Sequence, residues 1–283
     1  MIINSKFSSL YLGKWEEWQA PFDEDVCFLH TYAIGEEMRI QFIGFTDVFY
    51  ASYSDRYGNE TSLDVELLYT YDNSRYLFEI AFSVADPGLY ELYIGSVTDQ
   101  IYSYFCIKPL SELSDNTVLL NYAHRRNEYD TIFIGSDGFP RRFNFRVYGG
   151  IYPGDKEQAI DNEVFRDQRF ESFQTAAESY EISVLTIGTP RGVPQWVGNR
   201  INNIFKLSDV LVNGVETTRN EGSVPELVKV GQYYPLYVFK LNIEQPDEER
   251  VYTASPDSIS GMIITRDGNP IITRDGNYIV TRN

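Results

Sequence analysis

Apolar and polar residues alternate in short runs along residues 1–110, and this period of two predicts closely spaced β-strands. In the run "LDVELLYTY", every second residue from Leu63 to Tyr71 is apolar or aromatic, as expected for a strand with one buried face. Turn-forming residues separate the runs at short intervals, as in "SDRYGN" and "DPG". Other expected strands are "VCFLHTYA", "EEMRIQFIG", "RYLFEIAFS", "GLYELYIG" and "QIYSYFCIK". The pattern predicts a mainly β protein with an Ig-like β-sandwich over residues 1–110.

The segment "DPGLY" has the Asp-x-Gly-x-Tyr form of a tyrosine corner, in which the tyrosine hydroxyl bonds back to upstream backbone. Asp86, Gly88 and Tyr90 supply the three positions. In an antibody domain a cysteine follows two residues after the tyrosine, whereas here Leu92 stands there. The pattern is therefore typical of the sandwich and not of the antibody disulfide. An ordinary turn before an aromatic strand is the alternative interpretation.

A second β-rich (α+β) domain with one short helix is expected over residues 111–250. Its boundary falls in "KPLSELSDN", which has little periodicity and several turn-forming residues. Asn213 and Gly214 stand between two extended runs and predict a type I′ hairpin. The helix is expected near residues 194–207, because Pro194 suits a first turn and apolar residues recur at helical spacing. The apolar stripe, interpreted as core packing, consists of Trp196, Val197, Ile201, Ile204 and Phe205.

Residues 251–283 are expected to form a linker and a C-terminal β-repeat arm. The unit "IITRDGN" occurs twice and is followed by a shortened third copy, and its Asp-Gly pairs are turn signals. A hairpin packed on its own domain is one interpretation. Because the apolar residues come in adjacent pairs, each strand has one for either face, so we expect burial against a neighbouring subunit instead. The residues of this assembly arm are Ile263, Ile264, Ile271, Ile272, Ile279 and Val280.

The composition is that of a folded, acidic protein. Of the 283 residues, 43% are hydrophobic and 15% aromatic, which argues against wholesale disorder. Lys and Arg number 24 against 41 Asp and Glu, and the net charge of −17 disfavours nucleic acid as a ligand. Apolar runs are too short for a membrane span or a secretory signal, so we expect neither. Cys27 and Cys106 are expected to be buried thiols, with a disulfide as the alternative.

Histidines, cysteines and recognisable catalytic or metal-binding motifs are sparse in the sequence. His30 and His124 are the only histidines, and neither has Cys or His neighbours at zinc-ligand spacing. The segment "GGIYPGD" has two glycines at the separation of a phosphate loop, but Asp155 replaces the lysine and would repel phosphate. No Gly-x-Ser-x-Gly elbow is present. We therefore expect no enzymatic activity, no cofactor and no metal.

Three segments of the second domain carry a resemblance to a known group. They are "NEVFRDQRF", "LTIGTPRGVPQWVGNRINNIF" and "VLVNGVETTRNEGSVPE". These segments resemble a group of virion proteins of tailed bacteriophages whose usual hosts are gut bacteria of the Bacteroides type. The resemblance covers roughly residues 110–245 and is weaker over the N-terminal sandwich. The "IITRDGN" repeat is also similar to hydrophobic-acid-glycine repeats at the ends of phage structural proteins.

The resemblance implies a non-enzymatic structural component of the virion tail, made in the host cytoplasm and placed in the distal-tail, hub or baseplate region. Its implied partners are other copies of itself in an oligomeric ring and other tail proteins. It implies neither sequence-specific nucleic-acid binding nor membrane insertion. The alternative is a receptor- or carbohydrate-binding module at the tail tip or a cell surface, which the 22 tyrosines and 18 phenylalanines favour.

Overall fold

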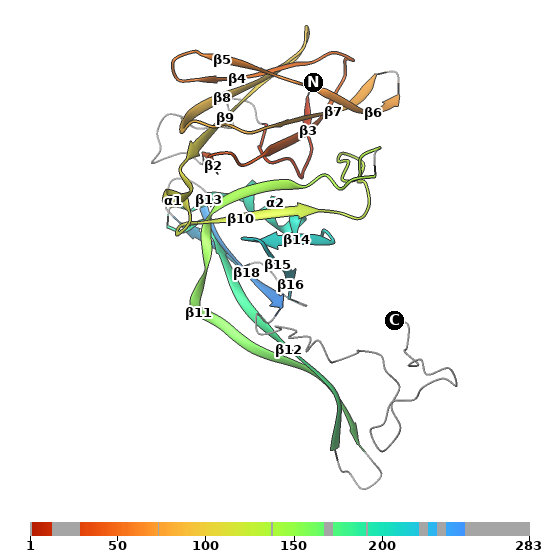
Figure 1. Ribbon diagram of the computed structural model, residues 1–283, viewed down its shortest axis with the longest axis vertical. Coiled ribbons are helices and arrows are strands. Elements are labelled where there is room, and N and C mark those ends of the chain that lie inside the picture. Colours follow the sequence, from red (N-terminus) through yellow and green to blue (C-terminus); the bar gives the residue numbers. More distant parts are fainter. Residues whose placement is uncertain are drawn as a thin grey trace, which may run out of the picture. The chain divides into compact units, whose positions relative to one another are not determined.

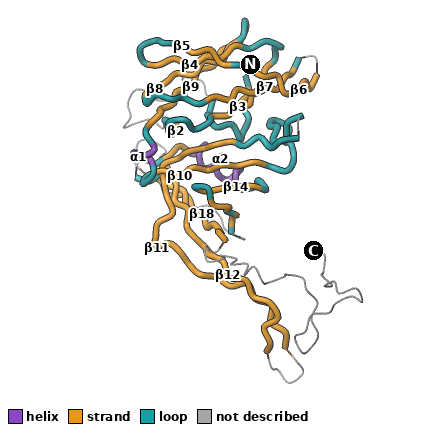
Figure 2. Tube along the Cα trace, in the orientation of Figure 1, coloured by secondary structure: helices purple, strands orange, loops and turns teal. Residues whose placement is uncertain are grey.

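The computed structural model describes most of the chain up to residue 246. The described residues are 2–12, 29–72, 74–136, 138–166, 172–190, 192–220, 226–230 and 236–246. Over this part the fold is mainly β, with eighteen strands and two short helices (Figures 1 and 2). Met1–Pro246 forms one compact unit. The expected assembly arm lies outside the described residues.

The N-terminal part is a β-sandwich of two sheets that face each other across a hydrophobic core. The four-stranded sheet has the order β1 (Ile3–Asn4), β3 (Met38–Gly44), β7 (Arg75–Phe82), β6 (Glu66–Asp72). The five-stranded sheet has the order β2 (His30–Ala33), β9 (Gln100–Lys108), β8 (Gly88–Gly95), β4 (Tyr50–Asp55), β5 (Glu60–Leu63). Their inner faces contribute to one cluster of buried side chains, among them Ile40, Phe42, Ile80, Leu92, Ile94 and Phe105. We call this cluster the first core.

The pattern of the run from Leu63 to Tyr71 predicts a single half-buried strand, and this prediction is wrong. The run is divided between β5, in the five-stranded sheet, and β6, at the edge of the four-stranded sheet. The pairing of β6 with β7 contains register shifts, one of them between Leu67 and Tyr69. A bulge moves the alternation by one residue, so a period of two no longer keeps one face buried. Leu67 and Tyr69 are 47% and 54% exposed as a result.

The expected tyrosine corner is present at the start of β8. The Tyr90 hydroxyl donates to the carbonyl oxygen of Asp86 at 3.0 Å, which is the contact that the Asp-x-Gly-x-Tyr pattern predicts. The Tyr90 ring stacks on Phe105 with centroids 5.5 Å apart. Burial, followed by the nearby charge of Asp86, raises the pKa of the Tyr90 hydroxyl. The hydroxyl is therefore protonated at neutral pH and acts as the donor.

Tyr90→Phe is expected to destabilise the protein by about 1 kcal/mol, the net contribution of one hydrogen bond. The ring and its packing remain, so only the bond to Asp86 is lost. Denaturant unfolding followed by circular dichroism measures the change. Tyr50→Phe, at a position that is 65% exposed, is the matched control, and we expect it to stay within about 0.5 kcal/mol of wild type. Equal effects of the two substitutions would contradict a stabilising corner.

The rest of the described chain builds a nine-stranded sheet and a second core. The main order is β13 (Val193–Pro194), β18 (Leu236–Pro246), β12 (Ser172–Ile187), β11 (Phe143–Arg166), β10 (Thr117–Ala123), β14 (Asp209–Val212), β15 (Val215–Glu216). Two further strands, β16 (Thr218–Arg219) and β17 (Glu226–Val230), pair with β18. The second core contains Val118, Leu120, Phe143, Phe145, Leu185 and Leu241 among its buried side chains. It is distinct from the first core.

The expected helix is α2 (Gln195–Ile204), which begins directly after Pro194. Its buried positions include Val197, Ile201 and Ile204, so the apolar stripe packs into the second core as predicted. Gly198 lies on the same side, where its missing side chain leaves room for the ring of Phe239.

Two turn regions compare differently with the sequence-based expectations. Asn213 and Gly214 connect β14 to β15 with positive φ angles of 51° and 85°, as the predicted type I′ hairpin requires. The segment expected to be a loop between domains instead contains the short helix α1 (Leu110–Leu113). It lies between β9, which contributes to the first core, and β10, which contributes to the second. Leu113 of this helix is buried.

Candidate functional site

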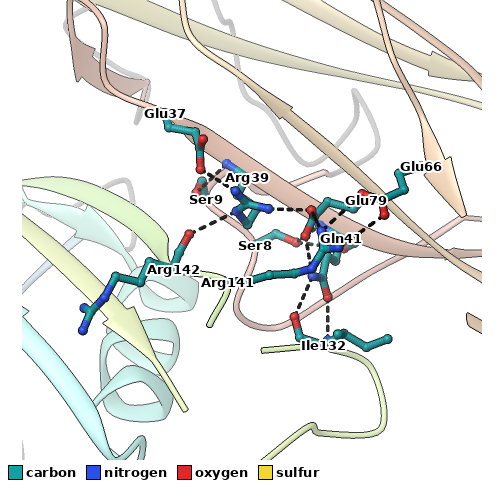
Figure 3. Close-up of polar contacts among 10 residues, drawn as sticks. All are labelled: Ser8, Ser9, Glu37, Arg39, Gln41, Glu66, Glu79, Ile132, Arg141 and Arg142. Carbon is teal, nitrogen blue, oxygen red and sulfur yellow. Dashed lines mark hydrogen bonds and ion pairs between the residues drawn. The ribbon is translucent and has the colours of Figure 1, made fainter. Parts of the chain in front are cut away.

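The two cores meet at a layer of polar contacts, which we call the junction. The junction lies against the outer face of the four-stranded sheet, and the N-terminal segment runs through it (Figure 3). In this segment the Phe7 side chain enters the second core, whereas Leu10 and Leu12 enter the first. Tyrosine hydroxyls from both sides hold its backbone: Tyr32 donates to Ser9 O and Tyr122 donates to Phe7 O, each at 2.6 Å. The N-terminal segment therefore lies between the two cores and is bound by side chains from both.

Glu79 on β7 is the centre of the junction, with a side chain only 2% exposed. Its Oε1 accepts from Arg39 Nη1 at 2.5 Å and also from Arg141 Nη1 (Figure 3). Arg39 belongs to β3 of the sandwich, whereas Arg141 precedes β11. One buried carboxylate thus joins two arginines that come from the two halves of the described structure. Charge-assisted bonds of this kind are the stronger class of protein hydrogen bond.

Gln41 on β3 makes a second set of contacts across the junction. It is fully buried and stands opposite Glu79 in the β3–β7 pairing. Its Nε2 donates to Glu79 Oε2 at 2.6 Å and to the carbonyl oxygen of Ile132 at 2.9 Å. Its Oε1 accepts from the Ile132 N–H at 2.7 Å. The amide of Gln41 therefore pairs with the Ile132 backbone much as a neighbouring strand would.

A separate buried ion pair joins the halves near α1. Arg146 on β11 is 5% exposed, and its Nε lies 2.9 Å from Glu36 Oε2, in the turn after β2. Arg146 Nη1 also donates to Thr117 Oγ1 at 2.7 Å. Glu36 in turn accepts from the Ala33 N–H at 2.8 Å. Arg146 and Glu36 are thus each bonded within their own half of the structure as well as to each other.

The junction also contains Arg200 and His30, which are both buried. Arg200 Nη1 donates to the carbonyl oxygen of Ser8, and its guanidinium lies 5.5 Å from the Phe145 ring centroid. His30 lies 5.1 Å from the Trp196 ring, and its Nε2 accepts from the backbone of Tyr11 at 3.3 Å. Burial, and then the charge of Arg200, lower the pKa of His30 well below its usual range. His30 is therefore a neutral packed ring.

The contacts of the junction can hold the two cores at a fixed angle to each other. Buried ion pairs add little net stability compared with apolar packing, because the charges must be removed from water. They are demanding in geometry, however, and a displaced partner leaves a buried charge unpaired. The junction therefore opposes hinge motion between the two cores more than it raises total stability.

Beyond the junction, β11 and β12 continue as a two-stranded ribbon, visible in Figures 1 and 2. β11 is 24 residues long, but β10 pairs only with its first six residues, up to Tyr148. β12 pairs with β18 only from Tyr180 onward. Between these limits lie residues 160–166 and 172–179, which pair with each other and with no other described strand. We call them the distal ribbon.

The residues weighed as candidate chemistry in the sequence do not gather at one place. His30 is buried in the junction, whereas His124 borders an open cleft of about 370 Å³. His124 Nδ1 accepts from the Ser208 N–H at 3.1 Å and lies 3.2 Å from the Ser208 hydroxyl. The Ser208 N–H occupies the Nδ1 lone pair of His124. This contact links the end of β10 to the loop before β14. Gly154 and Asp155, from the apparent phosphate loop, lie within strand β11 and not in a loop.

Of the two cysteines, Cys106 on β9 is buried and Cys27 falls outside the described residues. Among the residues that the structure describes, no group of three or more His, Cys, Asp or Glu side chains is placed to hold a metal ion. Neither described helix has the length and apolar character that a membrane crossing requires.

Sequence reasoning missed the junction entirely. Arg39, Gln41 and Glu79 alternate with apolar residues along β3 and β7, which is also the pattern of a strand with one face in water. The apolar residues Ile43 and Leu77, which pair with each other on that same face and are buried, were the available signal that the face is covered. Comparison with known proteins adds no relative: no protein-family model and no curated protein matches the chain.

Proposed function

We propose that this protein is a non-enzymatic structural subunit of a tailed-phage virion, which forms an oligomeric ring in the distal-tail, hub or baseplate region through β contacts between subunits. The observation that carries the proposal is the distal ribbon. Two-stranded ribbons are marginally stable alone in water, and both outer edges of this one are unpaired among the described strands. A neighbouring subunit would supply the missing contacts.

The junction provides a second, independent argument for this proposal. A ring that transmits force or sets a diameter needs subunits of constant shape, and the Glu79 and Arg146 contacts fix the angle between the two cores. An enzyme or a carrier more often needs parts that open. The edge strand β17 adds a further surface, with Leu227 and Val228 exposed to 47% and 42%.

The test removes the distal ribbon and preserves the sheet beneath it. Ala159 and Tyr180 are pairing partners, so residues 160–179 can be replaced by an Asn-Gly turn that joins them directly. We expect the shortened protein to unfold at nearly the wild-type midpoint but to lose its ring, as measured by light scattering and electron microscopy. Val97→Ser, at a position 98% exposed on another hairpin, is the control and keeps the ring.

Two results would count against the proposal. One is a ribbonless protein that assembles like wild type. The other is a wild-type protein that stays monomeric up to high concentration. Deleting residues 261–283 in parallel tests the arm, which stays a prediction because it lies beyond the described part of the chain. Loss of the ring in that variant alone would count against the ribbon and would assign the contact to the arm.

A further inference from the structure

The outer face of the five-stranded sheet is unusually rich in tyrosine. Because residues alternate along a strand, the positions beside the core residues of β4, β8 and β9 point the other way. Tyr93 stands opposite Tyr102 in the β8–β9 pairing, and Tyr50 stands opposite Gly95 in the β4–β8 pairing. Glu91 and Tyr104 form the next row. In Figure 1 strands β4, β5 and β8 of this sheet lie on the side of the sandwich away from the second core, whereas β2, at the other edge of the sheet, contacts β11.

The remaining residues of this face are small or polar. Alongside the tyrosines, the paired rows of β4, β5, β8 and β9 contain Ser52, Ser54, Ser62, Glu60, Glu91 and Gln100. Aliphatic residues of the same rows, such as Ala51, Leu92 and Ile94, lie in the first core. The cores of protein–protein interfaces are apolar and depleted of serine and glutamate, so this composition differs from theirs. Tyrosine with serine and carboxylate suits a ligand that has both apolar faces and many hydroxyls.

The geometry of the tyrosines favours stacking. Tyr93 and Tyr102 have ring centroids 5.3 Å apart and planes inclined at 52°, and Tyr102 is 38% exposed. A Cβ at Gly95 would overlap the Tyr93 hydroxyl and lie 2.9 Å from its Cε1. The Tyr93 ring therefore lies along the sheet, over the space that the glycine leaves. A ring lying against a sheet presents its face, and not its edge, to a ligand.

Hydrogen-bonding groups stand beside these rings. The hydroxyl of Tyr104 bonds to Glu91, and burial followed by this bond raises the pKa of Tyr104 to about 12. This bond holds the Glu91 carboxylate in place, and a carboxylate can accept about four hydrogen bonds in total. Ser54 on β4 pairs with Glu91 and adds a hydroxyl in the same row.

We propose that this face, formed by Tyr50, Tyr93, Tyr102, Glu91 and Ser54, binds a neutral glycan. The tyrosine rings stack on the apolar faces of the sugar rings, and Glu91 accepts hydrogen bonds from sugar hydroxyls. Neutral sugars are favoured over acidic ones because two carboxylates, Glu60 and Glu91, stand on the face and the chain carries a net charge of −17. This binding is separate from the proposed ring assembly.

The test is affinity electrophoresis of the full chain through gels containing a neutral polysaccharide, run for a β-glucan, an α-glucan, a xylan, a mannan and a galactan. We expect at least one of them to retard the wild-type protein. Tyr93→Ala and Tyr102→Ala are expected to weaken that binding about tenfold each, because each removes one stacking ring. Tyr57→Ala, 74% exposed on the turn between β4 and β5, is the matched control and keeps wild-type affinity.

Gly95→Ala gives a sharper test, because it leaves every tyrosine in the sequence. The three atoms nearest to the new methyl group all belong to the far end of the flexible Tyr93 side chain, so we expect the fold to be retained while the ring is displaced. We expect weaker glycan binding with an unchanged unfolding midpoint. Three outcomes overturn the proposal: no retardation by any of the five polysaccharides, binding that survives both tyrosine substitutions, or tyrosine variants that alter only the oligomeric state. The last would make this face a contact between copies of the chain.

Discussion

Replacing Glu79 with alanine is expected to lower the free energy of unfolding by about 3 kcal/mol, the lower end of the range for breaking a buried ion pair. The substitution leaves Arg39 and Arg141 mostly buried, with side chains 16% and 18% exposed and no carboxylate between them. Gln41 also loses an acceptor for its Nε2. The effect stays at the lower end because each arginine keeps a second acidic partner, Glu37 or Glu66.

Glu66→Ala is the matched control for this measurement. Glu66 also pairs with Arg141, at 3.2 Å, but its side chain is 60% exposed. An exposed pair contributes at most about 1 kcal/mol, so the two glutamates should differ clearly in urea denaturation. If Glu79→Ala costs no more than Glu66→Ala, the buried carboxylate does not hold the two halves together. Limited proteolysis near residues 108–116 should also become faster in Glu79→Ala, since the cores then separate more readily.

Gly149→Ala is the second large effect, with an expected loss of about 3 kcal/mol. Gly149 lies on β11 just after the segment paired with β10, and its φ of 146° is one that other residues rarely adopt. A Cβ there would overlap the carbonyl oxygen of Thr186 and come within 2.9 Å of Ile187 Cα. Both obstacles belong to the backbone of the adjacent strand, which cannot move aside without breaking the pairing of β11 with β12.

The neighbouring glycine provides an unusually close control. At Gly150 a Cβ would meet only the Tyr152 ring, at 3.8 Å, and no positive φ is involved. Gly150→Ala is therefore expected to change the free energy of unfolding by less than about 1 kcal/mol, or to stabilise the strand slightly. Thermal unfolding of both variants distinguishes the two sites. Similar midpoints would show that β11 tolerates a side chain at position 149 and that its path there is not constrained.

Local features were predictable because their causes are local. Asp86, Gly88 and Tyr90 form their turn and hydrogen bond within five residues, and Asn213 with Gly214 needs only its own backbone angles. The stripe on α2 follows from helical spacing. The mainly β character follows in the same way from alternation in many short runs. In each case the interacting residues are neighbours in sequence, so a short window contains the whole interaction.

The distal ribbon shows where a sequence window begins to fail. The run "RFNFRV" alternates as a strand does, but β11 continues far beyond it. Its extension includes Gly149, Gly150 and Gly154, which in isolation indicate a loop. Pairing with β12 on both sides of a register shift between Ile151 and Lys156 overrides these local preferences. Whether a polar segment extends as a strand depends on its partner and not on its own residues.

The junction was decided by the tertiary structure alone. Along β7 the face that carries Glu79 also holds Leu77 and Ala81, a mixed pattern that does not by itself decide whether water or protein covers this face. Only the packing of the second half over that face buries it and brings Arg141, 62 residues away, to its carboxylate. The sequence by itself therefore determined the mainly β character, the tyrosine corner, the Asn213–Gly214 hairpin and the apolar stripe of α2. The arrangement of the two cores, and with it the candidate site, arises from contacts between residues that are distant in sequence, which no local pattern records.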